Sequence, residues 1–156
     1  MTEIQRAPVR LFVPTPYLRV SDADAAIAFY ARVFGAVAVV RLREPGGRVA
    51  HAELRFGDEG SLMLSAEYPE YDIQGPLARG GTSVALQLYV EDVDAVFAVA
   101  ERVGARVLKP PALDPFGDRA GKFADPWGHE WLVCTRVETI DPHEMERRFA
   151  AMFDGT

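Results

Sequence analysis

The chain has 156 residues, of which 49% are hydrophobic and 26% charged, a composition that excludes a disordered chain, a collagen-like repeat and a coiled coil. Seventeen Lys and Arg against 23 Asp and Glu give a net charge of −6, which argues against a general nucleic-acid binder, since phosphate contacts need clustered positive charge. The single cysteine, Cys134, favours a reducing compartment. Because no secretory signal and no run of roughly 20 apolar residues is visible, we expect a soluble, cytoplasmic protein without a membrane partner.

The first half of the chain predicts a strand, a helix and three further strands. Residues 16–20 contain the β-branched and aromatic residues typical of a strand. A helix is expected next, because Asp22 can cap its start, Gly35 can close its end, and apolar residues recur at helical spacing between them. Strands separated by glycine-containing turns then follow at residues 37–42, 49–56 and 61–65.

The second half repeats this order. A strand is expected at residues 84–90, before a second helical pattern. Beyond that helix we expect a short strand at 106–108, a long loop rich in proline and glycine at 109–121, and a strand at 130–136. A terminal helix is predicted over 141–153, because its apolar residues fall on one side.

The two halves are related by an internal repeat of about 70 residues. Residues 20–25, VSDADA, return as VEDVDA at 90–95, and each copy opens a helix that ends at a Gly-Ala pair. Asp92 and Gly104 thereby correspond to Asp22 and Gly35. The repeat predicts two tandem β-α-β-β-β modules in an α+β fold.

This duplicated module is similar to the vicinal oxygen chelate superfamily, which includes glyoxalase I, extradiol dioxygenases, fosfomycin-resistance enzymes and bleomycin-binding proteins. Several stretches resemble its PhnB-like branch, at residues 16–20, 29–36, 51–54, 89–95, 116–119 and 125–131. The resemblance implies a half-open, mostly antiparallel barrel in one domain at 10–136, with modules at about 10–70 and 82–136 and a helical extension at 137–156. It also implies a homodimer and a small organic ligand.

In members with a catalytic metal, the first and last strands of each module supply His, Gln or Glu ligands. The resemblance places the corresponding positions at Thr15, Leu62 or Met63, Ala85 and Leu132. None of these side chains is a good ligand for a divalent metal. We therefore expect no metal and no cofactor.

The strand at residues 49–56 alternates sharply between apolar and polar residues. His51, Glu53 and Arg55 share one face, which we expect to look into the concave side of the sheet, while the apolar face packs beneath a helix. His51 and Glu53 are candidates for an acid–base pair, since histidine titrates near neutral pH. The same three residues can instead orient a bound ligand, or form a solvated strand face.

Aromatic residues that can line a pocket accompany this strand, because flat ligands bind well between such rings. Ordinary core packing is the alternative for several of them. Gln87 is expected to add a side-chain amide to the same cavity. His129 is interpreted as part of a structural turn, and Cys134 as a buried, unreactive thiol. The predicted ligand-binding residues are Tyr17, His51, Glu53, Arg55, Tyr68, Gln87, Phe116 and Trp127.

Three hypotheses follow. The first is a metal-independent, homodimeric protein that binds a small molecule and sequesters an aromatic ligand or antibiotic. The second is a lyase, isomerase or dioxygenase that uses His51 and Glu53, with Glu130 or His129, with or without a relocated divalent metal. The third is a domain that mediates assembly only.

Overall fold

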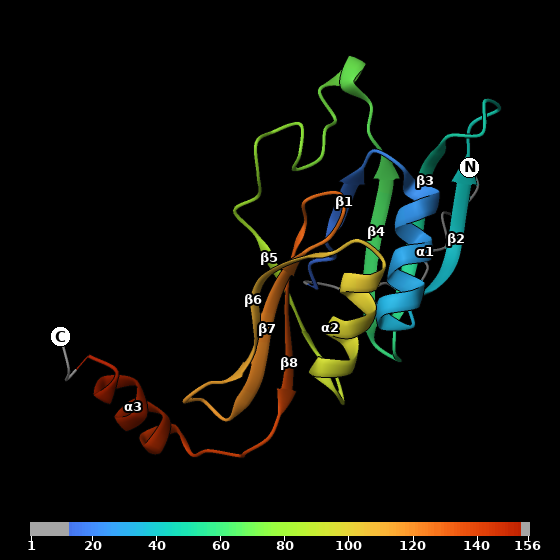
Figure 1. Cartoon of the computed structure of the whole chain (residues 1–156). Helices are drawn as coiled ribbons and strands as arrows, with labels where there is room; N and C mark the ends of the chain where they lie inside the picture. Colours follow the sequence, from blue (N-terminus) through green and yellow to red (C-terminus); the bar gives the residue numbers. More distant parts are fainter. Residues whose placement is uncertain (1–12, 154–156) are drawn as a thin grey trace, which may run out of the picture.

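The computed structural model describes residues 13–153, which form two four-stranded sheets and three α-helices (Figure 1). The sheets are not closed into a barrel, and four of the six strand pairings are antiparallel. The predicted α+β fold with two tandem modules and a C-terminal helix is confirmed. Residues 10–12 of the expected domain and 154–156 of the expected extension lie outside the described residues.

The first module forms sheet 1 and one helix. Its strand order is β1-β4-β3-β2, with β1 parallel to β4 and the other pairs antiparallel. A 3-10 turn, η1, follows at Pro69–Tyr71. The elements are β1 (Tyr17–Val20), α1 (Ala23–Phe34), β2 (Val37–Arg43), β3 (Val49–Phe56) and β4 (Gly60–Ala66).

The second module repeats this topology in sheet 2, with the order β5-β8-β7-β6. The pairing of β5 with β8 is parallel, as is that of β1 with β4, so the internal repeat is a structural one. The elements are β5 (Ala85–Tyr89), α2 (Val93–Arg102), β6 (Arg106–Leu113), β7 (Asp118–Ala124) and β8 (Glu130–Arg136).

The prediction of a long loop at residues 109–121 is wrong. Strand β6 continues to Leu113 and β7 begins at Asp118, so only a short turn separates them. Pro110 and Pro111 fit into β6 because it is an edge strand of sheet 2, and its register with β7 is irregular between Lys109 and Ala112. Edge strands tolerate proline, which cannot donate a ladder hydrogen bond.

The helix boundaries follow the predicted caps. The carboxylates of Asp22 and Asp92 accept hydrogen bonds from the third residue beyond them, Ala25 and Ala95. Gly35 closes α1 in the left-handed conformation, with φ of 67°. Helix α2 ends slightly earlier than expected, at Arg102.

The two modules pack through the faces that carry their helices. Helices α1 and α2 contact each other between the sheets (Figure 1). Trp131 of β8 reaches across to module one, with ring centroids 5.3 Å from Tyr30 and 4.7 Å from Phe34. Because the helical faces meet in one core, the opposite face of each sheet, called its outer face below, points away from the other module.

A buried carboxylate ties this seam together. Asp125, 4% exposed, accepts hydrogen bonds through Oδ2 from the Tyr30 hydroxyl (2.6 Å) and the Trp131 indole nitrogen (3.0 Å). Through Oδ1 it accepts from the backbone N–H groups of Trp127 and His129, both at 3.0 Å. Burial and the neighbouring carboxylate raise the pKa of Tyr30 well above its ordinary value, so its hydroxyl stays protonated and donates.

Helix α3 (Pro142–Ala151) projects away from both sheets (Figure 1). None of its residues is buried, and Phe149 meets the body of the protein through the ring of Phe116 at 6.0 Å. Arg147 and Arg148 lower the pKa of Glu144 to about 2 through hydrogen bonds within the helix. Within residues 13–153, no helix is long and apolar enough to cross a membrane.

Candidate functional site

Strand alternation places a set of polar side chains on the outer face of sheet 1. Tyr17 pairs with Met63 and Met63 with Glu53, so these three residues lie side by side across β1, β4 and β3. The intervening residues on the same strands, including Leu18, Leu54 and Leu64, are buried against the helical side. The predicted division of β3 into a polar and an apolar face is therefore the observed one.

Tyr17, His51 and Glu53 form a continuous hydrogen-bonded chain across this face. The Tyr17 hydroxyl lies 2.8 Å from His51 Nδ1, and His51 Nε2 lies 3.2 Å from Glu53 Oε1. A neutral imidazole with its proton on Nε2 satisfies both contacts, since it donates to the carboxylate and accepts from the hydroxyl. The side chains of His51 and Glu53 are 23% and 41% exposed. This geometry orients the imidazole while leaving it accessible to a ligand.

Arg19 and Arg55 add positive charge to the face. The Arg19 guanidinium lies 3.9 Å from the centre of the Tyr17 ring and donates a hydrogen bond to Ser65 Oγ at 2.6 Å. Within residues 13–153 neither arginine forms an ion pair with a carboxylate. Sequence reasoning missed Arg19, although its position two residues after Tyr17 on the same strand places both side chains on one face.

A polar hollow of about 290 Å³ adjoins Arg19 and Tyr17, where the loop after η1 crosses β1. Arg79 and His129 also line it. Gly75 is required there, because a Cβ at this position would lie 2.5 Å from the carbonyl oxygen of Arg19. His129 Nε2 donates to that same carbonyl oxygen at 2.9 Å, in agreement with its interpretation as a structural residue.

The outer face of sheet 2 carries a second polar cluster. The Tyr89 hydroxyl donates to Asp118 at 2.7 Å and accepts from Arg136 at 2.8 Å, and Arg136 also donates to Asp118. The hydrogen bond to the Asp118 carboxylate raises the pKa of Tyr89. Gln87 lies on this face as well, 3.8 Å from the sulfur of Cys134. The cluster was not anticipated, because its three members come from three separate strands.

The structure separates the other predicted ligand-binding residues from this site. Tyr68 donates to Glu44 at 2.7 Å at the end of sheet 1, and that hydrogen bond raises its pKa. Phe116 packs on α3, and Trp127 is 8% exposed, in the core against α1. Of the eight, the structure brings together Tyr17, His51, Glu53 and Arg55. A binding role for Phe116 or Trp127 stays a prediction without support from this placement.

In the vicinal oxygen chelate superfamily, which the sequence resembles, the metal ligands correspond to positions Thr15, Met63, Ala85 and Leu132 of this chain. The register resolves the choice at the end of module one, because Met63 lies on the outer face whereas Leu62 is buried in the core. Two aliphatic side chains, a thioether and a hydroxyl do not fit a divalent metal that requires imidazole or carboxylate donors. In the described part of the chain, no group of three or more His, Cys, Asp or Glu is placed to hold a metal.

Comparison with known proteins relates the chain to one family, and two of its relatives illustrate the similarity. A family model described as the Glyoxalase/Bleomycin resistance protein/Dioxygenase superfamily matches residues 11–133. The uncharacterized protein Mb0911c from Mycobacterium bovis is 36% identical over 144 residues, which cover 90% of this chain and 94% of that protein. The crystal structure of TioX from Micromonospora sp. ML1 superposes with a TM-score of 0.61 and 27% identity, over 83% of this chain and 99% of TioX.

A more distant relative carries the name of an enzyme. Lactoylglutathione lyase from Oryza sativa subsp. japonica is 24% identical over 142 residues, which cover 88% of this chain. The match spans 48% of the lyase. At this distance the similarity supports a common fold and leaves the reaction to be argued from the site.

Proposed function

We propose, since the chain belongs to the Glyoxalase/Bleomycin resistance protein/Dioxygenase superfamily, that it is a metal-independent protein that binds a small organic molecule on the outer face of sheet 1. The stretches of sequence described above support membership of its PhnB-like branch as part of this proposal. The ligand is an aromatic compound or antibiotic, which the protein sequesters in the cytoplasm.

The observation that carries this proposal is the contrast between two sets of residues. Thr15, Met63, Ala85 and Leu132 offer no donor set for a divalent metal, whereas the face beside Met63 presents ordered polar groups. Tyr17, His51 and Glu53 supply a hydroxyl, an imidazole and a carboxylate that fix one another. A few placed polar groups beside an aromatic ring are typical of a site that orients a ligand.

We also propose that the protein is a homodimer. Within residues 13–153 no segment covers Tyr17 on the outer face of sheet 1, and its side chain is 42% exposed. Phe149 of α3 is exposed as well. A second copy that covers these surfaces would bury apolar area and enclose the ligand, which a single open sheet face cannot do.

A second candidate function is a lyase, isomerase or dioxygenase that uses His51 as a general acid–base. The specific observation in its favour is the hydrogen bond from His51 Nε2 to Glu53 Oε1, because a carboxylate that orients an imidazole is a common arrangement in acid–base catalysis. On this hypothesis the His51→Ala variant folds and loses all turnover. Retained turnover would remove His51 from the mechanism.

A thermal-denaturation screen tests the proposed function. Purified protein is heated with bleomycin, with a panel of aromatic antibiotics and with aromatic carboxylic acids, and the melting temperature is recorded. We expect at least one compound to raise it, since a ligand that binds the native state alone stabilises that state. No rise with any compound, together with formation of lactoylglutathione in a parallel assay, would favour the enzyme instead.

A further inference from the structure

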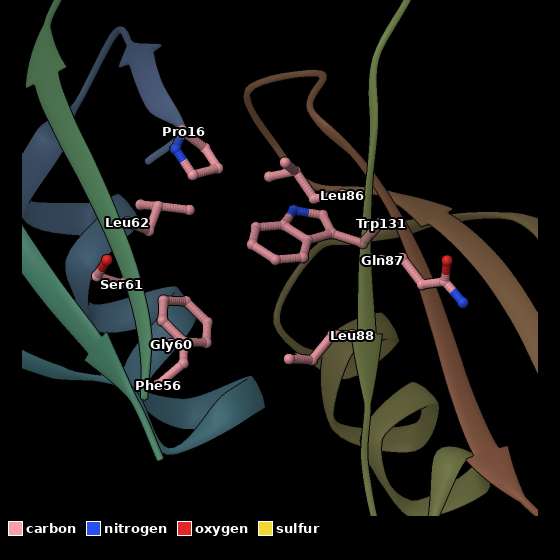
Figure 2. A pocket seen from close by; sticks show the side chains of 9 residues that line it. All are labelled: Pro16, Phe56, Gly60, Ser61, Leu62, Leu86, Gln87, Leu88 and Trp131. Carbon is pink, nitrogen blue, oxygen red and sulfur yellow. The ribbon is translucent and has the colours of Figure 1, made fainter. Parts of the chain in front are cut away.

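A second, apolar cavity lies at the seam between the modules, on the helical side of the sheets and apart from the polar outer face (Figure 2). Its volume is about 170 Å³. Figure 2 shows Pro16, Phe56 and Leu62 of module one facing Leu86, Leu88 and Trp131 of module two across it. We call this cavity the seam slot.

The sequence explains why the seam slot is open. Strand β4 begins at Gly60, but β1 pairs with it from Met63 onward. Pro14 and Pro16 lack the backbone N–H that would continue the ladder, so β1 starts at Tyr17, one residue later than expected. The first three residues of β4 therefore face the slot without a partner from β1, and β5 borders it from the other side as an edge strand.

The lining sets the chemistry of an occupant. The indole N–H of Trp131 is already committed to Asp125, so the ring presents hydrocarbon to the slot. The amide of Gln87 points away from the cavity (Figure 2), and among residues 13–153 no titratable side chain lines it. An apolar cavity of about 150 Å³ is large enough for benzene. The residues that line it offer no charged partner to a charged molecule.

We propose that the seam slot is a second binding site that takes a neutral molecule with a single aromatic ring. The ligand contacts both modules, so its binding stabilises their packing. Binding in the seam slot is independent of the polar site on sheet 1. Substitutions in the polar site therefore leave binding in the slot unchanged.

Benzene is the probe for the test, with the full-length protein and its melting temperature as the readout. At about ten times its Kd, benzene raises the melting temperature by roughly 4 °C. Leu88→Trp fills the slot and abolishes the rise, and Leu86→Phe reduces it if the first variant folds poorly. Leu113→Trp, which adds the same ring on the exposed part of β6, and His51→Ala both retain the full rise.

An unchanged melting temperature for the native protein with benzene would overturn the inference, and so would an equal rise in the Leu88→Trp and Leu113→Trp variants. Benzoate provides the contrasting probe. Benzoate is negatively charged at neutral pH, and the seam slot offers no partner for that charge. Any rise in melting temperature with benzoate is therefore abolished by His51→Ala and not by Leu88→Trp. If benzene does not raise the melting temperature, the proposal of a polar site on sheet 1 is unaffected. If no compound binds the polar site, the proposal of the seam slot is likewise unaffected.

Discussion

The Asp125→Ala variant is expected to lose at least about 3 kcal/mol of unfolding free energy, a large share of the stability of a domain of this size. The substitution leaves the buried Tyr30 hydroxyl and the Trp131 indole N–H without their acceptor. Each lost hydrogen bond to a charged group costs about 1.5–3 kcal/mol. Since Tyr30 belongs to module one and Trp131 to module two, the loss falls on the seam.

Chemical denaturation followed by circular dichroism measures this change, and the melting temperature should fall by roughly 6–12 °C. The unfolding free energy of Asp125→Asn should lie between those of Asp125→Ala and the native protein, because the amide oxygen keeps part of the acceptor capacity. Asp58→Ala, at the exposed turn between β3 and β4, is the matched control and should stay within about 0.5 kcal/mol. A loss of less than 1 kcal/mol for Asp125→Ala would contradict the role assigned to the seam.

The second large effect concerns the polar face. His51→Ala and Glu53→Ala are expected to weaken binding of the most stabilising compound of the screen by tenfold or more. Each removes a member of the chain that joins Tyr17, His51 and Glu53, and a hydrogen bond to a charged group corresponds to a factor of about ten or above. Both side chains are partly exposed, so folding should be little affected.

Isothermal titration calorimetry with the native protein and each variant measures this effect. His143→Ala supplies the control, because His143 is exposed on α3 and remote in sequence and structure from β3. Equal affinity of the native protein and both site variants would place the ligand elsewhere. Weaker binding by the His143 variant alone would point to α3 instead.

The alternation in β3 made the central part of the site predictable. A period of two places His51, Glu53 and Arg55 on one face whatever the rest of the fold does, and their neighbours are apolar enough to fix which face is buried. The internal repeat likewise predicted the two modules, since strand, cap and helix recur in the same order. Local signals of this kind need no knowledge of tertiary contacts.

The errors came from positions where tertiary context decides. Pro110 and Pro111 indicated a loop, yet an edge strand accommodates them. The period of a strand also does not tell how far an aromatic ring is buried. Trp127 is 8% exposed beside Phe29 of α1, and Phe116 packs on Phe149 of α3, so a binding role for either ring stays a prediction. The spacing of apolar residues along a strand or helix does not tell which way one module packs on the other.

The cluster of Tyr89, Asp118 and Arg136 could not be predicted from the sequence either. Its members are distant in sequence, and the register of three strands brings them together. A pattern search along the chain has no signal for such a group. Arg19, in contrast, was within reach of strand alternation from Tyr17.

Metal content tests the central claim most directly. Untagged protein is purified without chelators and analysed for elements against protein concentration, before and after incubation with Ni²⁺, Zn²⁺, Mn²⁺ and Fe²⁺ followed by removal of free metal. The donor set of Thr15, Met63, Ala85 and Leu132 predicts far less than one bound metal per chain in every case. About one metal per chain would contradict the account and make a metal-dependent enzyme the leading function.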